Sequence, residues 1–252
     1  MCVKKIRPVH VITFLMIQSG SVTAQNNPWE LGLNLGAYVY QGDLSPQRAG
    51  SLKTIRPGIG LSAARWIAPL FSVAGVFNWA SLKGDEARYS HPEYRSHRAF
   101  AFSTSLKELG LHARYFPMGN SEYLPLLEPY AFAGISLGFI NTKKDFSRFD
   151  TVYFGETRAA EILAALATDN AQKTKRSILN IPVGAGLRYA LNDNWLLYTE
   201  ANFRLGGSDF MDGFSQSVNP QLKDHFYSQS VGITYKMGGR KKGKGLGCPA
   251  VN

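Results

Sequence analysis

Apolar and polar residues alternate with a period of two along three long stretches of the chain. Between Trp29 and Tyr40 the odd positions hold Trp, Leu, Ala or Val, whereas the even positions hold Glu, Gly, Asn or Tyr. Stretches 181–191 and 227–237 follow the same rule. Because successive side chains of a strand point to opposite faces, each stretch predicts a strand with one apolar face.

Five further segments carry a weaker form of this alternation. They are Pro57–Trp66, Phe71–Ala80, Leu106–Phe116, Tyr130–Ile140 and Leu196–Leu205. The total is then eight strands, each about as long as the roughly 9–11 residues that cross a bilayer at a tilt. An even number of such strands is typical of single-chain outer-membrane proteins. The pattern predicts an all-β protein, an eight-stranded antiparallel transmembrane β-barrel in the bacterial outer membrane.

The connections between the predicted strands alternate in length. Connections 67–70 and 192–194 are short, and connection 117–128 is still compact. The other four are long and polar, at Gln41–Arg56, Ser81–Arg98, Asn141–Ser177 and Gly206–His225. Outer-membrane barrels have short periplasmic turns and longer outer loops, so this asymmetry favours a barrel over a soluble sandwich.

The third long connection contains a predicted helix. Its segment Glu156–Leu166 has a helical composition, with Ile162, Leu163 and Leu166 along one side. Loops longer than about 15 residues are commonly functional or disordered. The helix is expected to plug the lumen, to lie on the rim, to meet a partner, or simply to be a solvated surface helix.

Composition agrees with strands that are apolar on one face only. Of the 252 residues, 44% are hydrophobic, 12% aromatic and 18% charged, and 25 are glycine. So many aromatic residues need burial, which argues against intrinsic disorder. After residue 25 no apolar run approaches the roughly 18 residues that a spanning helix needs. The mean hydropathy is only −0.16, because the hydropathies of the apolar and the polar faces of the strands cancel in the average.

The first 24 residues have the features of a secretory signal peptide. Lys4, Lys5 and Arg7 precede a mostly apolar stretch at 9–17, and the small-x-small pattern of Val22–Ala24 predicts cleavage before Gln25. The expected organisation is a signal peptide at 1–24, a barrel domain at 25–238 and a basic periplasmic tail at 239–252.

Alternation alone does not say which face is outside, so a secreted β-sandwich or a lipocalin-like barrel remains a competing fold. Aromatic residues at the ends of the predicted strands favour the membrane, where such rings form interfacial girdles. These residues are Trp29, Tyr40, Trp66, Trp79, Tyr115, Phe116, Tyr130, Trp195 and Tyr235.

If the apolar faces meet lipid, seven charged side chains point into the barrel. They are Glu30, Glu108, Arg114, Arg188, Glu200, Arg204 and Lys236. Side chains just fill the interior of an eight-stranded barrel. Since both signs of charge are present, we expect a paired structural network that holds water rather than a channel lining. Glu200 and Arg204 lie on one face of one strand, four residues apart, so they could share a partner across the lumen.

Candidate catalytic residues are few. His112 and His225 are the histidines near strand ends, and His225 has Asp224, Ser228 and Ser230 close by in the sequence. Strand neighbours face opposite ways, and the G-x-S-x-G motif of serine hydrolases is absent. Asp209, Asp212 and Asp224 have no established metal-ligand spacing. We therefore predict no catalytic residues, no metal and no cofactor.

The C-terminal tail is strongly basic. Arg240, Lys241, Lys242 and Lys244 provide much of the formal net charge of +10. Nucleic acid is an implausible partner for an exported protein. Acidic lipid headgroups or an acidic periplasmic protein suit the tail better, and a solvated tail that limits aggregation is an equal alternative. Cys248 should lie in the periplasm, either paired with a cysteine of another protein or as a free thiol.

Six segments, in order along nearly the whole mature chain, resemble the PorG-like outer-membrane barrels of Bacteroidota. The resemblance lies in Gly36–Leu44, Arg56–Gly60, Pro129–Ile135, Ile181–Gly186, Glu200–Arg204 with Ser208–Ser215, and Cys248–Ala250. It implies an OmpA-type barrel associated with the type IX secretion machinery, where PorG-like proteins contact periplasmic ring components and lipoproteins.

The function expected from these observations is a non-enzymatic outer-membrane scaffold or anchor for a cell-envelope assembly. Its tail and periplasmic turns would hold the partner, and outer-membrane lipids would surround its wall. The charged inward face leaves a small-solute channel as an alternative. His225 and its neighbours leave a lipid-modifying enzyme as a further one.

Overall fold

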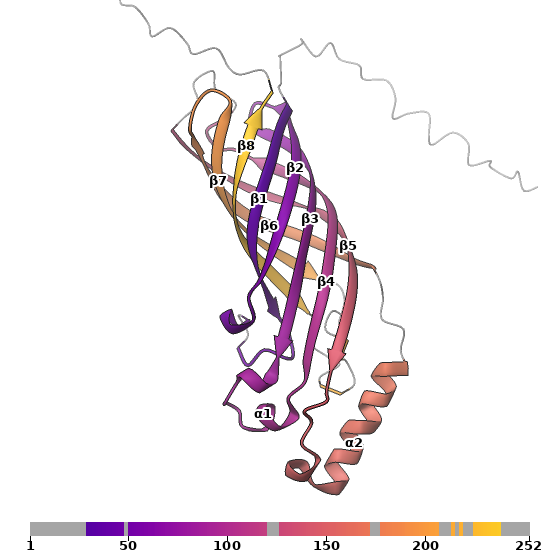
Figure 1. Cartoon of the computed structure of the whole chain (residues 1–252). Coiled ribbons are helices and arrows are strands. Elements are labelled where there is room, and N and C mark those ends of the chain that lie inside the picture. The colour runs from indigo at the N-terminus through magenta and orange to yellow at the C-terminus, as the bar shows by residue number, and fades with distance from the viewer. Residues whose placement is uncertain are drawn as a thin grey trace, which may run out of the picture.

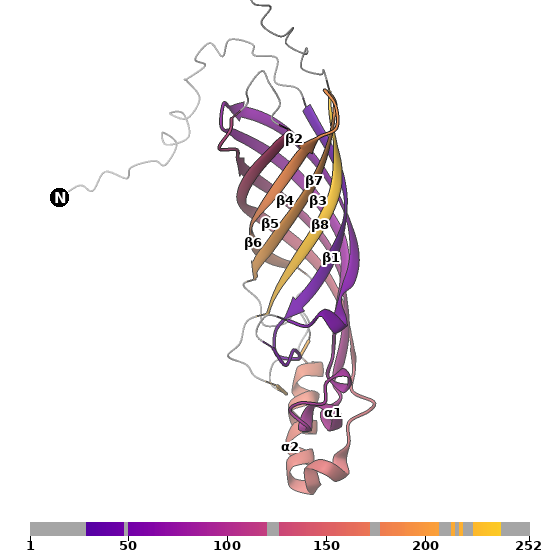
Figure 2. The ribbon, with the colours of Figure 1, turned by 90° about the vertical axis from the view of Figure 1, so that its left-hand side faces the viewer.

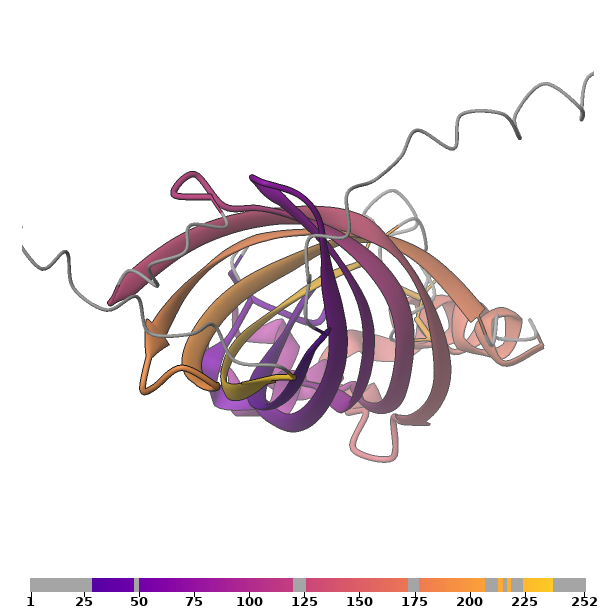
Figure 3. The same ribbon diagram turned by 90° about the horizontal axis from the view of Figure 1, so that it is seen from above.

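Eight antiparallel strands form a closed barrel in the computed structural model (Figure 1), which describes residues 29–47, 50–119, 126–171, 177–206, 213–214, 217–218 and 224–237. Each strand pairs with the next in sequence, and β8 pairs with β1 from Glu30↔Lys236 to Gln41↔His225. Figure 3 shows the closed ring from above. The predicted fold class is confirmed. The strands are β1 Trp29–Gln41, β2 Arg56–Ala68, β3 Phe71–Asp85, β4 Ala101–Tyr115, β5 Leu127–Asp145, β6 Ser177–Ala190, β7 Trp195–Gly206 and β8 His225–Lys236.

All eight predicted segments are strands, but several of them reach further toward the outer end than predicted. Strands β3 and β5 extend into the connections predicted at 81–98 and 141–177, and β4 begins at Ala101, five residues before its predicted start at Leu106. The outward positions of these extensions are polar, for example Ser81, Ser103 and Asn141. The apolar-polar alternation ends where the lipid ends, whereas the hydrogen-bonded ladder continues beyond it.

Large apolar side chains cover the outside of the barrel. Leu35 is 69% exposed, Leu179 is 65% exposed and Leu109 is 61% exposed. An apolar wall of this extent is far larger than the patches that soluble monomers carry. Since the barrel is closed and its interior is polar, the wall faces lipid, and the protein lies in the bacterial outer membrane. The soluble sandwich and the lipocalin-like barrel, which turn their apolar faces inward, are excluded.

The predicted aromatic girdle is wrong for four of its nine members. Tyr40, Trp66, Phe116 and Tyr130 are at most 4% exposed and point into the barrel. The other five rings lie on the outside, close to the two ends of the apolar wall, as expected for an interfacial girdle. These five are Trp29, Trp79, Tyr115, Trp195 and Tyr235.

Short turns join the strands at one end of the barrel, and the helices lie beyond the other end (Figures 1 and 2). Helix α1 spans Tyr94–Arg98 and α2 spans Thr151–Ala171, with short 3-10 turns at Leu52–Thr54 and Glu86–Arg88. The short turns mark the periplasmic end and the helices mark the outer end. Helix α2 contains the predicted segment 156–166 and is longer by a turn or more, with a break in helical geometry at Gly155.

No helix in the described part of the chain has both the length and the hydropathy needed to span a membrane.

Two inward-facing glycines make room for large rings inside the barrel. A Cβ at Gly186 would lie 2.3 Å from the ring of Tyr130, and one at Gly184 would lie 2.5 Å from the ring of Phe132. These glycines lie on β6, and the rings project from the neighbouring strand β5. The Gly-rich inner face of β6 is therefore the complement of two aromatic side chains.

Candidate functional site: the filled barrel interior

All seven charged residues predicted to face inward are buried inside the barrel. Their exposed fractions range from 1% for Glu108 and Arg204 to 9% for Glu200. An eighth member, Glu128, is 3% exposed and was missed because the sequence placed it in the turn before β5. The sequence could have shown its inward position, since Glu128, Tyr130 and Phe132 are spaced two residues apart and therefore point to the same face of the strand. The interior thus holds four carboxylates and four cations within the membrane-spanning part of the described strands.

Arg188 organises the periplasmic half of this network. Its guanidinium donates to Glu30 at 2.7 Å and to Glu128 at 2.5 and 3.0 Å. Lys236 Nζ lies 3.7 Å from Glu30, which also accepts from the indole N–H of Trp66 at 3.1 Å. Buried charges are costly unless they are paired and hydrogen-bonded, so these partners allow charged side chains from β1, β5, β6 and β8 to meet here.

An aromatic cluster fills the space around Arg188. Trp66, Phe116, Tyr130 and Phe132 form one buried group. The guanidinium carbon of Arg188 lies 4.1 Å from the ring centre of Phe116, a cation–π contact. We call these four residues and Arg188 the periplasmic plug.

Arg204 and Glu108 form a second ion pair nearer the outer end. Arg204 Nη2 lies 3.2 Å from Glu108 Oε2, and its Nη1 donates to the hydroxyl of Ser228 at 2.5 Å. Glu108 also accepts from Asn78 at 3.0 Å and from Ser136 at 2.7 Å. These contacts join β3, β4, β5, β7 and β8 across the lumen.

Glu200 and Arg204 could have shared a partner across the lumen, but they do not. Glu200 accepts a hydrogen bond from the hydroxyl of Tyr130 at 2.8 Å, whereas Arg204 pairs with Glu108. The two side chains share one strand face but lie four residues apart. In a barrel whose strands are tilted, that spacing brings them opposite different neighbours.

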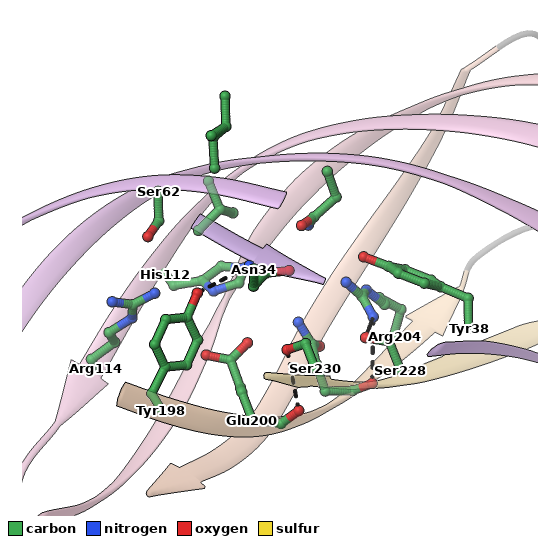
Figure 4. A pocket seen from close by; sticks show the side chains of 14 residues that line it. Asn34, Tyr38, Ser62, His112, Arg114, Tyr198, Glu200, Arg204, Ser228 and Ser230 are labelled. Carbon is green, nitrogen blue, oxygen red and sulfur yellow. Dashed lines mark hydrogen bonds between the residues drawn. The ribbon is translucent and has the colours of Figure 1, made fainter. Parts of the chain in front are cut away.

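The space left in the middle of the lumen is very small. Figure 4 shows the side chains of Asn34, His112, Arg114 and Tyr198 converging there. The cavity they help to line has an accessible volume of about 10 Å³, which is close to the minimum for one water molecule. His112 Nδ1 and Arg114 Nε have no partner among the described protein atoms, so a water in this cavity would complete their hydrogen bonding.

A large apolar cluster closes the outer end of the barrel. Its members come from strands, from outer connections and from α2. We call this cluster the outer plug: Tyr38, Tyr40, Leu44, Ala80, Leu82, Phe100, Phe102, Leu106, Ile140, Ile162, Leu166, Ile178, Phe214 and Phe226. Phe100 stacks on Phe214 with ring centres 5.0 Å apart, and Tyr40 meets Phe102 edge to face at 4.7 Å.

Helix α2 is part of this outer plug, but only two of the three residues predicted to lie along one side of it are buried. Ile162 is 9% exposed and Leu166 is 2% exposed, but Leu163 is 45% exposed and faces outward. Asp169, also on α2, accepts from the backbone and hydroxyl of Ser217 at 3.0 and 2.6 Å. The simple solvated surface helix is therefore ruled out, because one side of α2 packs into the outer plug, beyond the ends of the strands (Figure 1).

A buried charge cluster supports the connection between β3 and β4. Glu86 is fully buried and binds Arg95 at 2.9 Å and Arg98 at 2.5 Å. Burial alone would lower the pKa of Arg98, but the hydrogen bonds and the charge of Glu86 raise it above its ordinary value. This cluster keeps α1 fixed against the 3-10 turn at Glu86–Arg88.

The candidate catalytic residues His112, His225, Asp224 and Ser228 each contact a neighbouring group of the barrel. His112 stacks on Phe132 inside the lumen with ring centres 4.9 Å apart. His225 Nδ1 accepts from the backbone N–H of Gly206 at 3.2 Å, and Asp224 accepts from Tyr40 at 2.6 Å. Ser228 is buried in the lumen beside Arg204. In the described part of the chain, no group of three or more His, Cys, Asp or Glu side chains could hold a metal ion.

Several predictions lie outside the described residues. They concern the signal peptide, Asp209, Asp212, the basic residues Arg240, Lys241, Lys242 and Lys244, and Cys248.

Several solved outer-membrane proteins have folds similar to that of this chain. The chain is similar to Ail, the attachment invasion locus protein of Yersinia pestis, with 13% identity, a TM-score of 0.44 and coverage of 84% of this chain and 99% of that one. It is similar to Neisserial surface protein A at 16% identity and a TM-score of 0.47, covering 83% and 97%. It is also similar to OprG from Pseudomonas aeruginosa, with 13% identity, a TM-score of 0.47 and coverage of 84% of this chain and 96% of that one.

A search of curated proteins finds no match to this chain. A family model does match it, over residues 7–232, which include all of β1–β7 and most of β8. The chain therefore belongs to the family described as a domain of unknown function, DUF6089.

Proposed function

We propose that this protein is a non-conducting, non-enzymatic anchor in the outer membrane that holds a component of a cell-envelope assembly. The observation that carries the proposal is the filled lumen. The periplasmic plug, the two ion-pair clusters and the outer plug leave a cavity of about 10 Å³, whereas a channel needs a continuous aqueous path. A barrel that conducts nothing acts through its surfaces and its ends.

The resemblance to PorG-like barrels supports the choice of partner. It covers segments of β1, β2, β5, β6 and β7 and the chain end, in the same order. On this proposal, the periplasmic turns and the basic tail bind a periplasmic ring protein or lipoprotein of a secretion system. The sequence supplies a cationic segment at 240–244 for an acidic partner.

Affinity capture from gently solubilised membranes tests the anchor role. The wild-type barrel is expected to retain a periplasmic or lipid-anchored protein. A variant with Arg240, Lys241, Lys242 and Lys244 changed to Gln is expected to lose it while still inserting into the membrane. Arg158→Gln on α2, at the outer end, is the matched control and should retain the partner. Recovery of the barrel alone, with no cell-envelope protein, contradicts the anchor role.

A further inference from the structure

A polar band with lysines lies on the outer wall, just above the apolar belt of β3, β4 and β5. In one row of paired residues, Trp79 faces Lys107, and Lys107 faces Phe139. The next outward-facing row is Ser81, Ser105 and Asn141, and the row above it is Lys83, Ser103 and Lys143. The band is at the outer end, where the headgroups of the outer leaflet lie.

Two lysines of this band have ammonium groups available for a ligand. Lys107 and Lys143 are exposed, and neither has an ion-pair partner among the described residues. Lys83 differs, because its Nζ lies 3.3 Å from Asp85. Lys143 is one strand across and four residues along from Lys107, so their flexible stems can reach one large headgroup. Ser103, Ser105 and Asn141 add hydrogen-bonding groups between them.

Two apolar grooves lie on the wall near Lys107, one beside it on β1 to β4 and one below it on β3 to β6. The first has a volume of about 410 Å³ and is lined by residues that include Leu35, Ile59 and Trp79. Trp79 is the direct cross-strand neighbour of Lys107.

The second groove has a volume of about 430 Å³ and begins at Leu109, the next outward residue below Lys107. Gly75 has no side chain to fill this groove. A Cβ added to it would have a single neighbouring atom within 4 Å, the backbone oxygen of Ala63 at 3.9 Å.

This combination selects the chemistry of the ligand. Exposed ammonium groups beside hydroxyl and amide groups suit phosphate and sugar, and the grooves suit hydrocarbon chains. A lipid with one compact headgroup would use one groove and one lysine. The wall has two grooves and two exposed lysines, which suit a larger lipid with several chains and more than one phosphate. We propose that this face of β1–β6 is a binding site for a phosphorylated glycolipid of the outer leaflet, with phosphate on Lys107 and Lys143 and acyl chains in the two grooves.

Native mass spectrometry of the full mature barrel in detergent micelles tests the proposal. The probes are diphosphorylated lipid A, the same lipid without its phosphates, and phosphatidylglycerol. We expect one tightly bound diphosphorylated lipid, with at least tenfold weaker binding of both other lipids. Inorganic phosphate at millimolar concentration should not displace it, because the chains contribute to binding.

Three variants separate the parts of the site. Each lysine near a membrane surface contributes about fivefold in affinity, so Lys107→Gln with Lys143→Gln should weaken binding by about 20- to 30-fold. Gly75→Leu should fill the second groove and weaken binding while all charges remain. Arg65→Gln is the matched control, because Arg65 is also a cation on the outer wall but pairs with Trp29 at the periplasmic end. A heat-modifiable gel shift verifies that each variant is folded.

The alternatives give different results. Equal binding of lipid with and without phosphates would overturn the role of the lysines. Equal binding of phosphatidylglycerol would overturn the assignment to a glycolipid. Binding that falls as much in Arg65→Gln as in the double lysine variant would show that only overall charge matters, and would also overturn the site.

Discussion

At the residue scale, the barrel interior is organised by pairing. Arg188 is held by two carboxylates and an aromatic ring, and Arg204 by Glu108 and Ser228. Each of these groups would be costly to bury alone, and each is acceptable only because its partners are present. Whether a residue points into the barrel or out to lipid therefore determines its role. Its distance from the strand end matters less.

The first prediction concerns Arg188. Replacing it with Met leaves Glu30 with the distant Lys236 and the Trp66 indole as partners, and leaves Glu128 without its ionic partner. We expect the free energy of unfolding to fall by about 3–5 kcal/mol, measured by urea titration of the barrel folded in lipid vesicles. Arg65→Met, on the outer wall, is the control and should change it by less than about 1 kcal/mol. Equal effects of the two substitutions would contradict the pairing argument.

The second prediction concerns the inner glycines. Gly186→Val places a branched side chain against the ring of Tyr130, where even a Cβ would be 2.3 Å away. Overpacking of this kind costs about 1–3 kcal/mol, which the same urea titration would detect. Gly75→Val, on the open outer wall, is the control. A neutral Gly186→Val would show that the ring is free to move aside.

Four aromatic residues illustrate what the sequence could and could not decide. Tyr40, Trp66, Phe116 and Tyr130 stand at strand ends, which alone suggests a girdle. Their phase matches that of the inward residues Tyr38, Ala64, Arg114 and Phe132, so the alternation could have placed them correctly. Which carboxylate pairs with which cation depends on barrel tilt and register, which no local pattern encodes.

At the element scale, α2 is held by a small number of contacts on one side. The third prediction uses two of its leucines. Leu166→Ala removes a side chain that is 2% exposed, and Leu163→Ala removes one that is 45% exposed. The first should destabilise the docking of α2 by about 2–5 kcal/mol and speed proteolysis near 151–171. The second should leave the proteolysis rate near that of the wild type, and equal acceleration by both would contradict the docking.

The fourth prediction is a pH dependence at the start of α2. Asp150 accepts from His97 Nδ1 at 3.0 Å and from the backbone N–H groups of Val152 and Tyr153, each at 3.1 Å. The His97 hydrogen bond, followed by those of the backbone, lowers the pKa of Asp150 below its ordinary value of 3.8.

Because the folded pKa is the lower one, the stabilisation is present above the unfolded pKa and is lost as pH falls through the folded value. Amide hydrogen exchange of residues 151–154 should therefore accelerate, relative to α2 as a whole, as pH falls below about 4. Asp150→Asn should remove this pH dependence. A profile that is the same in both proteins would contradict the assignment.

At the scale of the whole molecule, the fold and the location could be predicted from the sequence. The outer wall is apolar and the interior is polar, so apolar and polar residues alternate along each strand. The outer plug could not be predicted, since Leu44, Phe100, Phe214 and Leu166 come from four separate segments with no common pattern. Loop packing of this kind depends on how distant segments meet, so a long helical connection could be predicted but the side on which its helix docks could not.

The central claim is that the lumen is filled from end to end, and single-channel recording tests it most directly. Purified wild-type barrel in a planar bilayer should give no conductance steps above the bare-membrane baseline at either polarity. A known porin in the same membrane serves as the positive control. Reproducible discrete steps from the folded wild-type barrel would show a continuous aqueous path and would contradict the account.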